Sequence, residues 1–91
     1  MSEHYGLFLG RIKVLGAGPE GDKLEQMVLE GEKFLGMPQE VDRITHPVKV
    51  ALYGSYTMPA LVFGRQVVLY GRVPAFEEVL SLLEMEKNNK Y

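Results

Sequence analysis

The sequence contains no cysteine among its 91 residues. This absence excludes disulfide bonds, thiolate nucleophiles, cysteine-bound iron–sulfur clusters and zinc sites of the cysteine type. His4 and His46 are isolated, and neither has a second histidine or a suitably spaced carboxylate beside it. We therefore expect no metal site and no Ser-His-Asp arrangement, and we assign no catalytic residue and no cofactor.

A strong charge of one sign is absent too, since the formal net charge is −2. Such a balance does not favour binding to a phosphate backbone or to an anionic membrane. No apolar run approaches the ~18 residues of a membrane helix, and no basic segment followed by a long apolar stretch opens the sequence. We expect a cytoplasmic protein that binds neither nucleic acid nor membrane, and one domain with a modest core.

What the sequence does contain is an alternation of strand and helix patterns. Alternating or continuous apolar runs predict strands over residues 11–15, 40–44, 60–63 and 66–70. Apolar residues at helical spacing predict helices over residues 23–35, 47–53 and 74–83. The order βαβαββα predicts an α/β fold in which helices flank a mixed four-stranded sheet, with a right-handed parallel crossover at its start.

The start of the first helix has a specific interpretation. Asp22 is a suitable N-cap, because its carboxylate can accept hydrogen bonds from the free N–H groups of the first turn. Glu25, three residues later, would complete a capping box. The polar face of this helix is expected to carry Glu25, Gln26, Glu32 and Lys33.

The two ends are expected to lie outside the domain of residues 11–84. Residues 1–10 form an N-terminal extension in which Leu7-Phe8-Leu9 is either an additional edge strand or a clasp. Residues 85–91 are charged and polar, and we interpret the chain after Glu84 as a loose tail.

Three segments carry a resemblance to a known fold. Residues 12–18 read as a strand followed by glycines, residues 57–62 place Pro59 just before a strand, and residues 71–79 open a helix with Gly-Arg-Val-Pro. In this order and spacing they resemble the thioredoxin fold, and within it the small thioredoxin-like proteins called redox-active disulfide proteins. The resemblance covers residues 11–83 and implies a thioredoxin-like βαβαββα domain.

The resemblance fails where that family carries its Cys-x-x-Cys motif. The motif falls on Pro19-Glu20-Gly21-Asp22, or equally well on residues 18–21, and neither cysteine is present. Dithiol–disulfide exchange needs a thiolate and a resolving thiol. The sequence therefore predicts a member of the fold that has lost its dithiol chemistry.

The Met58-Pro59 dipeptide is the strongest candidate for a retained function. The resemblance implies a cis peptide bond here, with the backbone N–H and C=O of Met58 facing outward, as in redox-active relatives that hold an extended peptide or glutathione. In the alternative interpretation Pro59 only shapes the turn. The predicted binding residues, which we call the rim, are Pro19, Glu20, Gly21, Asp22, Tyr56, Met58 and Pro59.

These features favour a non-catalytic module that binds a protein or peptide, or that associates with itself through free sheet edges. One alternative is a redox-linked protein that acts through bound glutathione or through the cysteines of a partner. Another is a structural subunit of a larger complex.

Overall fold

The computed structural model describes residues 11–90 of the protein. The expected extension of residues 1–10, with Leu7-Phe8-Leu9, lies outside the described residues. The elements of the described chain are β1 (Ile12–Leu15), α2 (Pro19–Phe34), β2 (Asp42–Ile44), α3 (Pro47–Ala51), β3 (Ala60–Phe63), β4 (Gln66–Tyr70) and α4 (Phe76–Lys90).

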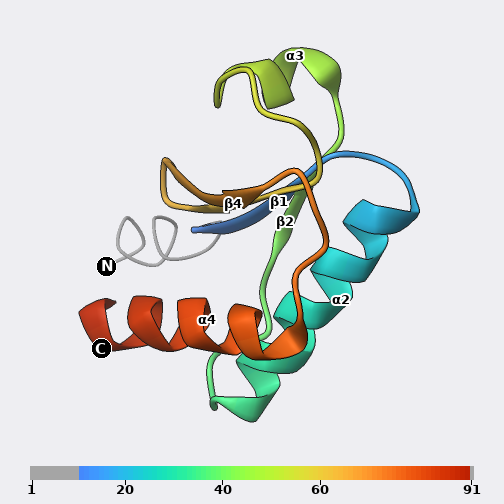
Figure 1. Ribbon diagram of the computed structural model, residues 1–91. Coiled ribbons are helices and arrows are strands. Elements are labelled where there is room, and N and C mark those ends of the chain that lie inside the picture. The colour runs from blue at the N-terminus through green and yellow to red at the C-terminus, as the bar shows by residue number, and fades with distance from the viewer. Residues whose placement is uncertain (1–10, 91) are drawn as a thin grey trace.

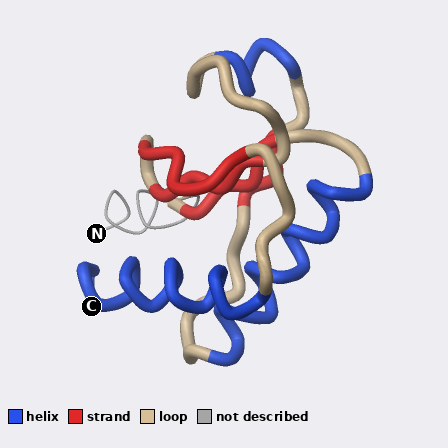
Figure 2. The backbone as a smooth tube through the Cα atoms, in the orientation of Figure 1, coloured by secondary structure: helices blue, strands red, loops and turns tan. Residues whose placement is uncertain are grey.

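The strands form one mixed sheet in the order β2-β1-β3-β4. β1 is parallel to β2 and antiparallel to β3, and β3 is antiparallel to β4. Figure 1 and Figure 2 show α2 and α4 on one face of this sheet and the short α3 on the other. The predicted α/β class with a mixed four-stranded sheet is confirmed. None of the described helices is long and apolar enough to cross a membrane.

The core is divided by the sheet into a large and a small part. β3 contributes to both, because its side chains alternate between the two faces. Leu61 and Phe63 face the larger cluster beneath α2 and α4, and Ala60 and Val62 face the smaller one on the side of α3. A central strand buried on both faces explains why residues 60–63 are uninterruptedly apolar.

α2 and α4 pack closely at Gly31. A Cβ atom on this residue would lie 2.7 Å from Cδ1 of Leu83, so a larger residue would require the Leu83 side chain to move. Leu24 and Val28 lie on the same face of α2 and are fully buried. This face holds the N-terminus of α2 in place below the end of β1.

The predicted start of the first helix is wrong. α2 begins at Pro19, and its N-cap is Gly18, which makes no side-chain capping hydrogen bond. Proline suits the first helical position, because its φ is already helical and its missing N–H would have no partner there. Asp22 and Glu25 are therefore not a capping box but lie within the first two turns of the helix.

The placement of Glu32 on the exposed face of this helix is also wrong. Glu32 is four residues after Val28 and eight after Leu24, so helical spacing puts it on the buried face, and only 1% of it is exposed. Its Oε1 has no hydrogen-bond partner among the described residues. Burial raises the pKa of the Glu32 carboxyl to about 8, although a backbone hydrogen bond at Glu40 opposes this.

A loose tail after Glu84 is not what the structure contains. α4 continues to Lys90, and Glu86 is buried and forms an ion pair with Arg11. Nζ of Lys87 donates a hydrogen bond of 2.6 Å to the C=O of Leu35, beyond the end of α2. Glutamate, methionine and lysine are good helix formers, and these contacts to two other elements fix the added turns.

We expect the free energy of unfolding to decrease as the pH rises from 4.5 to about 8, the window between the ordinary and the folded pKa of Glu32. Over this range the unfolded chain releases a proton that the folded chain retains, so the change opposes folding. Glu32→Gln removes the ionisable group and should exceed the wild type in stability by about 1–3 kcal/mol at about pH 8.5, and by less at about pH 5.

Urea unfolding followed by circular dichroism at both pH values measures this difference. Glu30→Gln, a change of an exposed glutamate in the same helix, is the matched control and should show no such pH dependence. An equal stability difference at both pH values for Glu32→Gln would contradict the assignment.

Candidate functional site

The rim is formed where the loop after β1 meets the loop before β3. Gly16 follows β1 with a φ of +113°, a conformation that favours glycine. A Cβ atom on Gly16 would lie only 3.0 Å from Cβ of Met58. The missing side chain at Gly16 thus allows Met58 to lie directly beside the segment that leads into α2.

The side chain of Arg43, on β2, binds this segment from the other side. Its Nε donates a hydrogen bond of 2.8 Å to the C=O of Gly16, and its Nη2 donates one of 3.3 Å to the C=O of Gly18. Its Nη1 lies 2.9 Å from both Oδ1 of Asp22 and Oε1 of Glu25. One guanidinium therefore joins the edge strand, the glycine loop and the start of α2.

Gly21 leaves the space in which this guanidinium lies. A Cβ atom on Gly21 would be 2.5 Å from Nη2 of Arg43 and 2.7 Å from the C=O oxygen of Gly16. Gly21 is buried, although it belongs to the first turn of a helix that starts at the surface. Its role is to let Arg43 and Gly16 approach the helix backbone.

Arg43 pairs with two carboxylates at this position, those of Asp22 and Glu25, so the cluster keeps a net negative charge. Burial lowers the pKa of Arg43, but its hydrogen bonds to Asp22 and Glu25 raise the pKa more in sum, so the guanidinium stays charged. Asp22 is 73% exposed apart from this contact, and Glu20 and Pro19 are exposed beside it. The carboxylate of Asp22 thus serves as an ion-pair partner of Arg43.

Met58 and Pro59 lie at the base of the rim. Their peptide bond is cis, Pro59 is buried, and the C=O of Pro59 accepts a hydrogen bond of 2.9 Å from the N–H of Gly71. Within residues 11–90 the N–H and C=O of Met58 make no backbone hydrogen bond. The Met58 side chain packs in part against the small core cluster of Leu15, Ala60 and Val62.

Tyr56 takes a different direction from the other rim residues. Its ring lies 4.7 Å from the ring of Tyr70 at the end of β4, with an angle of 53° between the planes, and both side chains are exposed. Tyr53, the other aromatic side chain considered for the rim, packs against the small cluster below α3. The aromatic part of this surface is therefore the Tyr56–Tyr70 pair.

Sequence reasoning missed Arg43 and Tyr70. Residues 40–44 were read as a half-exposed strand, and a strand parallel to β1 carries its last residues toward the loop that follows β1. Arg43 near the end of this strand could therefore have been predicted to bind the loop that follows β1. Tyr70 lies opposite Ala60 because the β3–β4 register shifts between Leu61 and Val62, whereas the regular register of the predicted hairpin would have paired Ala60 with Leu69.

The comparisons with known proteins agree with this architecture. Residues 10–84 match the sequence model of the thioredoxin domain family. The chain therefore belongs to the thioredoxin domain family, and the expected resemblance is confirmed. No curated protein and no solved structure matches the chain significantly. Since the sequence has no cysteine, this member carries no dithiol of its own.

The remaining chemistry of the site is limited. No group of three or more histidines, aspartates or glutamates in the described part of the chain is arranged to hold a metal ion. The rim instead presents two exposed carboxylates, an exposed aromatic pair and backbone groups of Met58.

We expect Arg43→Lys to lower the free energy of unfolding by about 1–3 kcal/mol, because lysine cannot serve all four acceptors of the guanidinium. Amide hydrogen exchange should quicken most over residues 16–22. The matched control is Arg72→Lys, which breaks an exposed two-bond pair with Glu78 and should leave the free energy of unfolding nearly unchanged. Equal losses in both variants, or unchanged exchange over residues 16–22, would show that Arg43 does not hold the loop.

Proposed function

We propose that the protein is a non-catalytic thioredoxin-like module that binds an extended segment of a protein partner at its rim. The observation that carries this proposal is the combination of a missing dithiol with backbone groups of Met58 that have no backbone partner in residues 11–90. A free N–H and C=O beside a strand can pair with an extended peptide in the manner of an added strand.

The state of the helix start supports the non-catalytic part of the proposal. In this family the N-terminus of the first helix supports a reactive thiolate, and here the same place holds an Arg43–Asp22 ion pair. The guanidinium is satisfied by four acceptors and is 17% exposed, so it is not available to a substrate. The Arg43–Asp22 ion pair thus stabilises the start of α2 and leaves no free guanidinium for chemistry.

The Tyr56–Tyr70 pair supports the binding part. Exposed aromatic residues give large apolar contacts at low cost in side-chain entropy, and methionine adapts to different partners. Met58 and Tyr56 are two residues apart in one loop, so a segment paired with Met58 would pass close to the aromatic pair. The partner chemistry that fits is an extended peptide with apolar side chains.

The exposed carboxylates argue against the glutathione alternative. Glu20 and Asp22 place negative charge at the start of α2, where a small anion would otherwise bind to free N–H groups. Glutathione is anionic, and it would meet these like charges. A second copy of the chain remains within the proposal, since β2 and β4 are the two edges of the sheet and edges of this kind can pair.

Selection of displayed random peptides against the wild-type protein should yield apolar sequences that bind in extended form. Tyr56→Lys and Met58→Lys should weaken a selected peptide at least about tenfold, because a lysine removes the apolar contact. Val48→Lys, a matched change of an exposed apolar residue on α3, should alter affinity less than about twofold. Fluorescence anisotropy measures the affinities, and circular dichroism checks the fold.

Methylation of alternate backbone nitrogens of the selected peptide should abolish binding at positions that face Met58 and leave the others unaffected. If no peptide is enriched, or if the rim variants and Val48→Lys bind alike, the proposal is wrong. Sedimentation of the free protein, of Met58→Lys and of Tyr56→Lys decides whether the partner is a second copy.

Purified protein should give no insulin reduction and no glutathione-dependent disulfide exchange above the buffer rate, because it has no thiolate to attack a disulfide. The assay is run with and without glutathione, so that a bound thiol would be detected. Turnover that is proportional to protein concentration would overturn the non-catalytic proposal in favour of the redox-linked alternative.

A further inference from the structure

The C-terminus of α2 is closed by a turn that leads the chain back toward β2. The N–H of Met37 donates a hydrogen bond of 2.8 Å to the C=O of Glu32, and the N–H of Gly36 donates one of 3.2 Å to the C=O of Lys33. Gly36 has a φ of +72°. These two bonds and the left-handed glycine define a Schellman motif, which satisfies carbonyl groups that the end of a helix leaves free.

Glu32 has an unusual place in this motif. A Schellman motif is often completed by an apolar contact between the two residues that its longer bond joins, and here these are Met37 and Glu32. Both are buried, with 7% of Met37 and 1% of Glu32 exposed. Oε1 of Glu32 has no hydrogen-bond partner among the described residues. A carboxyl group therefore occupies a position at which the motif favours an apolar side chain.

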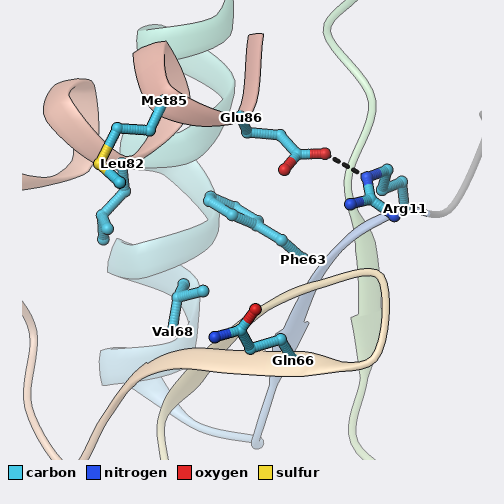
Figure 3. Close-up of a pocket in the computed structure, with 7 residues that line it drawn as sticks. All are labelled: Arg11, Phe63, Gln66, Val68, Leu82, Met85 and Glu86. Carbon is cyan, nitrogen blue, oxygen red and sulfur yellow. Dashed lines mark hydrogen bonds and ion pairs between the residues drawn. The ribbon is translucent and has the colours of Figure 1, made fainter. Parts of the chain in front are cut away.

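α4 stabilises this end of α2 from the side. Nζ of Lys87 donates a hydrogen bond of 2.6 Å to the C=O of Leu35, the residue that follows α2. The neighbouring Glu86 forms an ion pair with Arg11, and Figure 3 shows its carboxylate directed toward that guanidinium. The two charged groups of this turn of α4 are therefore engaged with partners other than the carboxyl of Glu32.

The other charged groups around Glu32 do not compensate for its burial. Lys33 is exposed on α2, and on β2 Asp42 is exposed and Arg43 is bound at the opposite end of α2. Burial raises the pKa of the Glu32 carboxyl to about 8; a backbone hydrogen bond at Glu40 opposes this rise, and the like charge of Glu40 adds to it. The negative end of the helix macrodipole also disfavours a carboxylate in the last turn.

We propose that the carboxyl of Glu32 is a proton-dependent switch of the connection formed by residues 35–41. While the carboxyl is neutral, it stays in the core and the Schellman turn is closed. Loss of the proton leaves a buried charge without an ion-pair partner in the described chain, so the carboxylate moves into water and the turn opens with it. Opening exposes Met37 and releases the chain that enters β2, an edge strand of the sheet.

The closed and the open turn differ in how readily Glu32 ionises. In the open turn the carboxyl is in water and has its ordinary pKa of 4.5, whereas in the closed turn its pKa is about 8. Between these values the open turn releases a proton that the closed turn retains, so the opening constant should rise about tenfold per pH unit. Above this range the carboxyl is ionised in both states, and the opening constant should level off.

Amide hydrogen exchange of the full chain between about pH 5.5 and about pH 7.5 tests the switch. Exchange from an open amide is proportional to the hydroxide concentration. At Gly36 and Met37 the opening constant adds a second proportional dependence, so their rates should follow the square of the hydroxide concentration. The control is Gly71, whose bond to the C=O of Pro59 involves no residue of the connection, and its rate should follow the first power.

Two substitutions separate the carboxyl from the shape of the turn. Glu32→Gln removes the titration, so the rates at Gly36 and Met37 should fall to the first-power dependence. Glu32→Met gives the motif an apolar side chain, and it should also slow both amides at least about tenfold at about pH 7.5. Glu30→Gln, a change of an exposed glutamate in the same helix, is the matched control and should keep the squared dependence.

Three results would overturn the proposal. The first is a first-power dependence at Gly36 and Met37 in the wild type, and the second is a squared dependence that persists in Glu32→Gln. The third is exchange of these amides as slow as that of the β3 amides, since the turn would then open only when the whole domain unfolds. Tyr56→Lys and Met58→Lys should leave these rates unchanged, so this outcome is separate from that of the proposed function.

Discussion

The architecture of this site depends on the guanidinium of Arg43. Four acceptors on two other segments converge on it, and the strand that carries it has only three residues. A short edge strand is weakly held by its ladder alone, and the Arg43 side chain adds contacts to the glycine loop and to α2. The strand in turn fixes the backbone of Arg43, so that the planar guanidinium can donate hydrogen bonds to the C=O groups of the glycine loop. Arg43 therefore joins the edge strand β2 to the start of α2, and we refer to these two elements as one unit.

This unit explains how a thioredoxin domain remains ordered at a position that no longer performs redox chemistry. A helix N-terminus has unpaired N–H groups and a partial positive charge. In this protein the carboxylate of Asp22 lies near them without capping them, and the positive charge of Arg43 balances it. The position has been filled with an ion pair whose members satisfy each other, so it has little tendency to bind anions or to activate a nucleophile.

Local sequence patterns were sufficient for the sheet but not for the site. The limits of β3 and β4 follow from apolar runs on both sides of Gly64-Arg65, and each was predicted to the residue. The start of α2 was predicted wrongly, because Asp22 has the side chain of an N-cap residue, whereas the helix begins three residues earlier with Pro19 at its first position. Glu32 was assigned by its polarity, whereas its spacing from Val28 decided its burial. Arg43 and Glu86 act through partners that are distant in the chain, and no local pattern reveals such partners.

The guanidinium of Arg43 lies in the space that a side chain at position 21 would need, and this restricts which residues can replace Gly21 and Arg43. Any side chain at position 21 would displace the guanidinium of Arg43. If Arg43 is lost instead, Gly21 remains in the helix, where glycine lowers helix stability by about 1 kcal/mol relative to alanine. Neither residue has a favourable single replacement. Loss of Arg43 would not open position 21 to a side chain, because a Cβ atom there would still lie 2.7 Å from the backbone oxygen of Gly16. Descendants of this sequence should therefore keep Gly21 even where they replace Arg43, whereas they can keep Arg43 only together with Gly21.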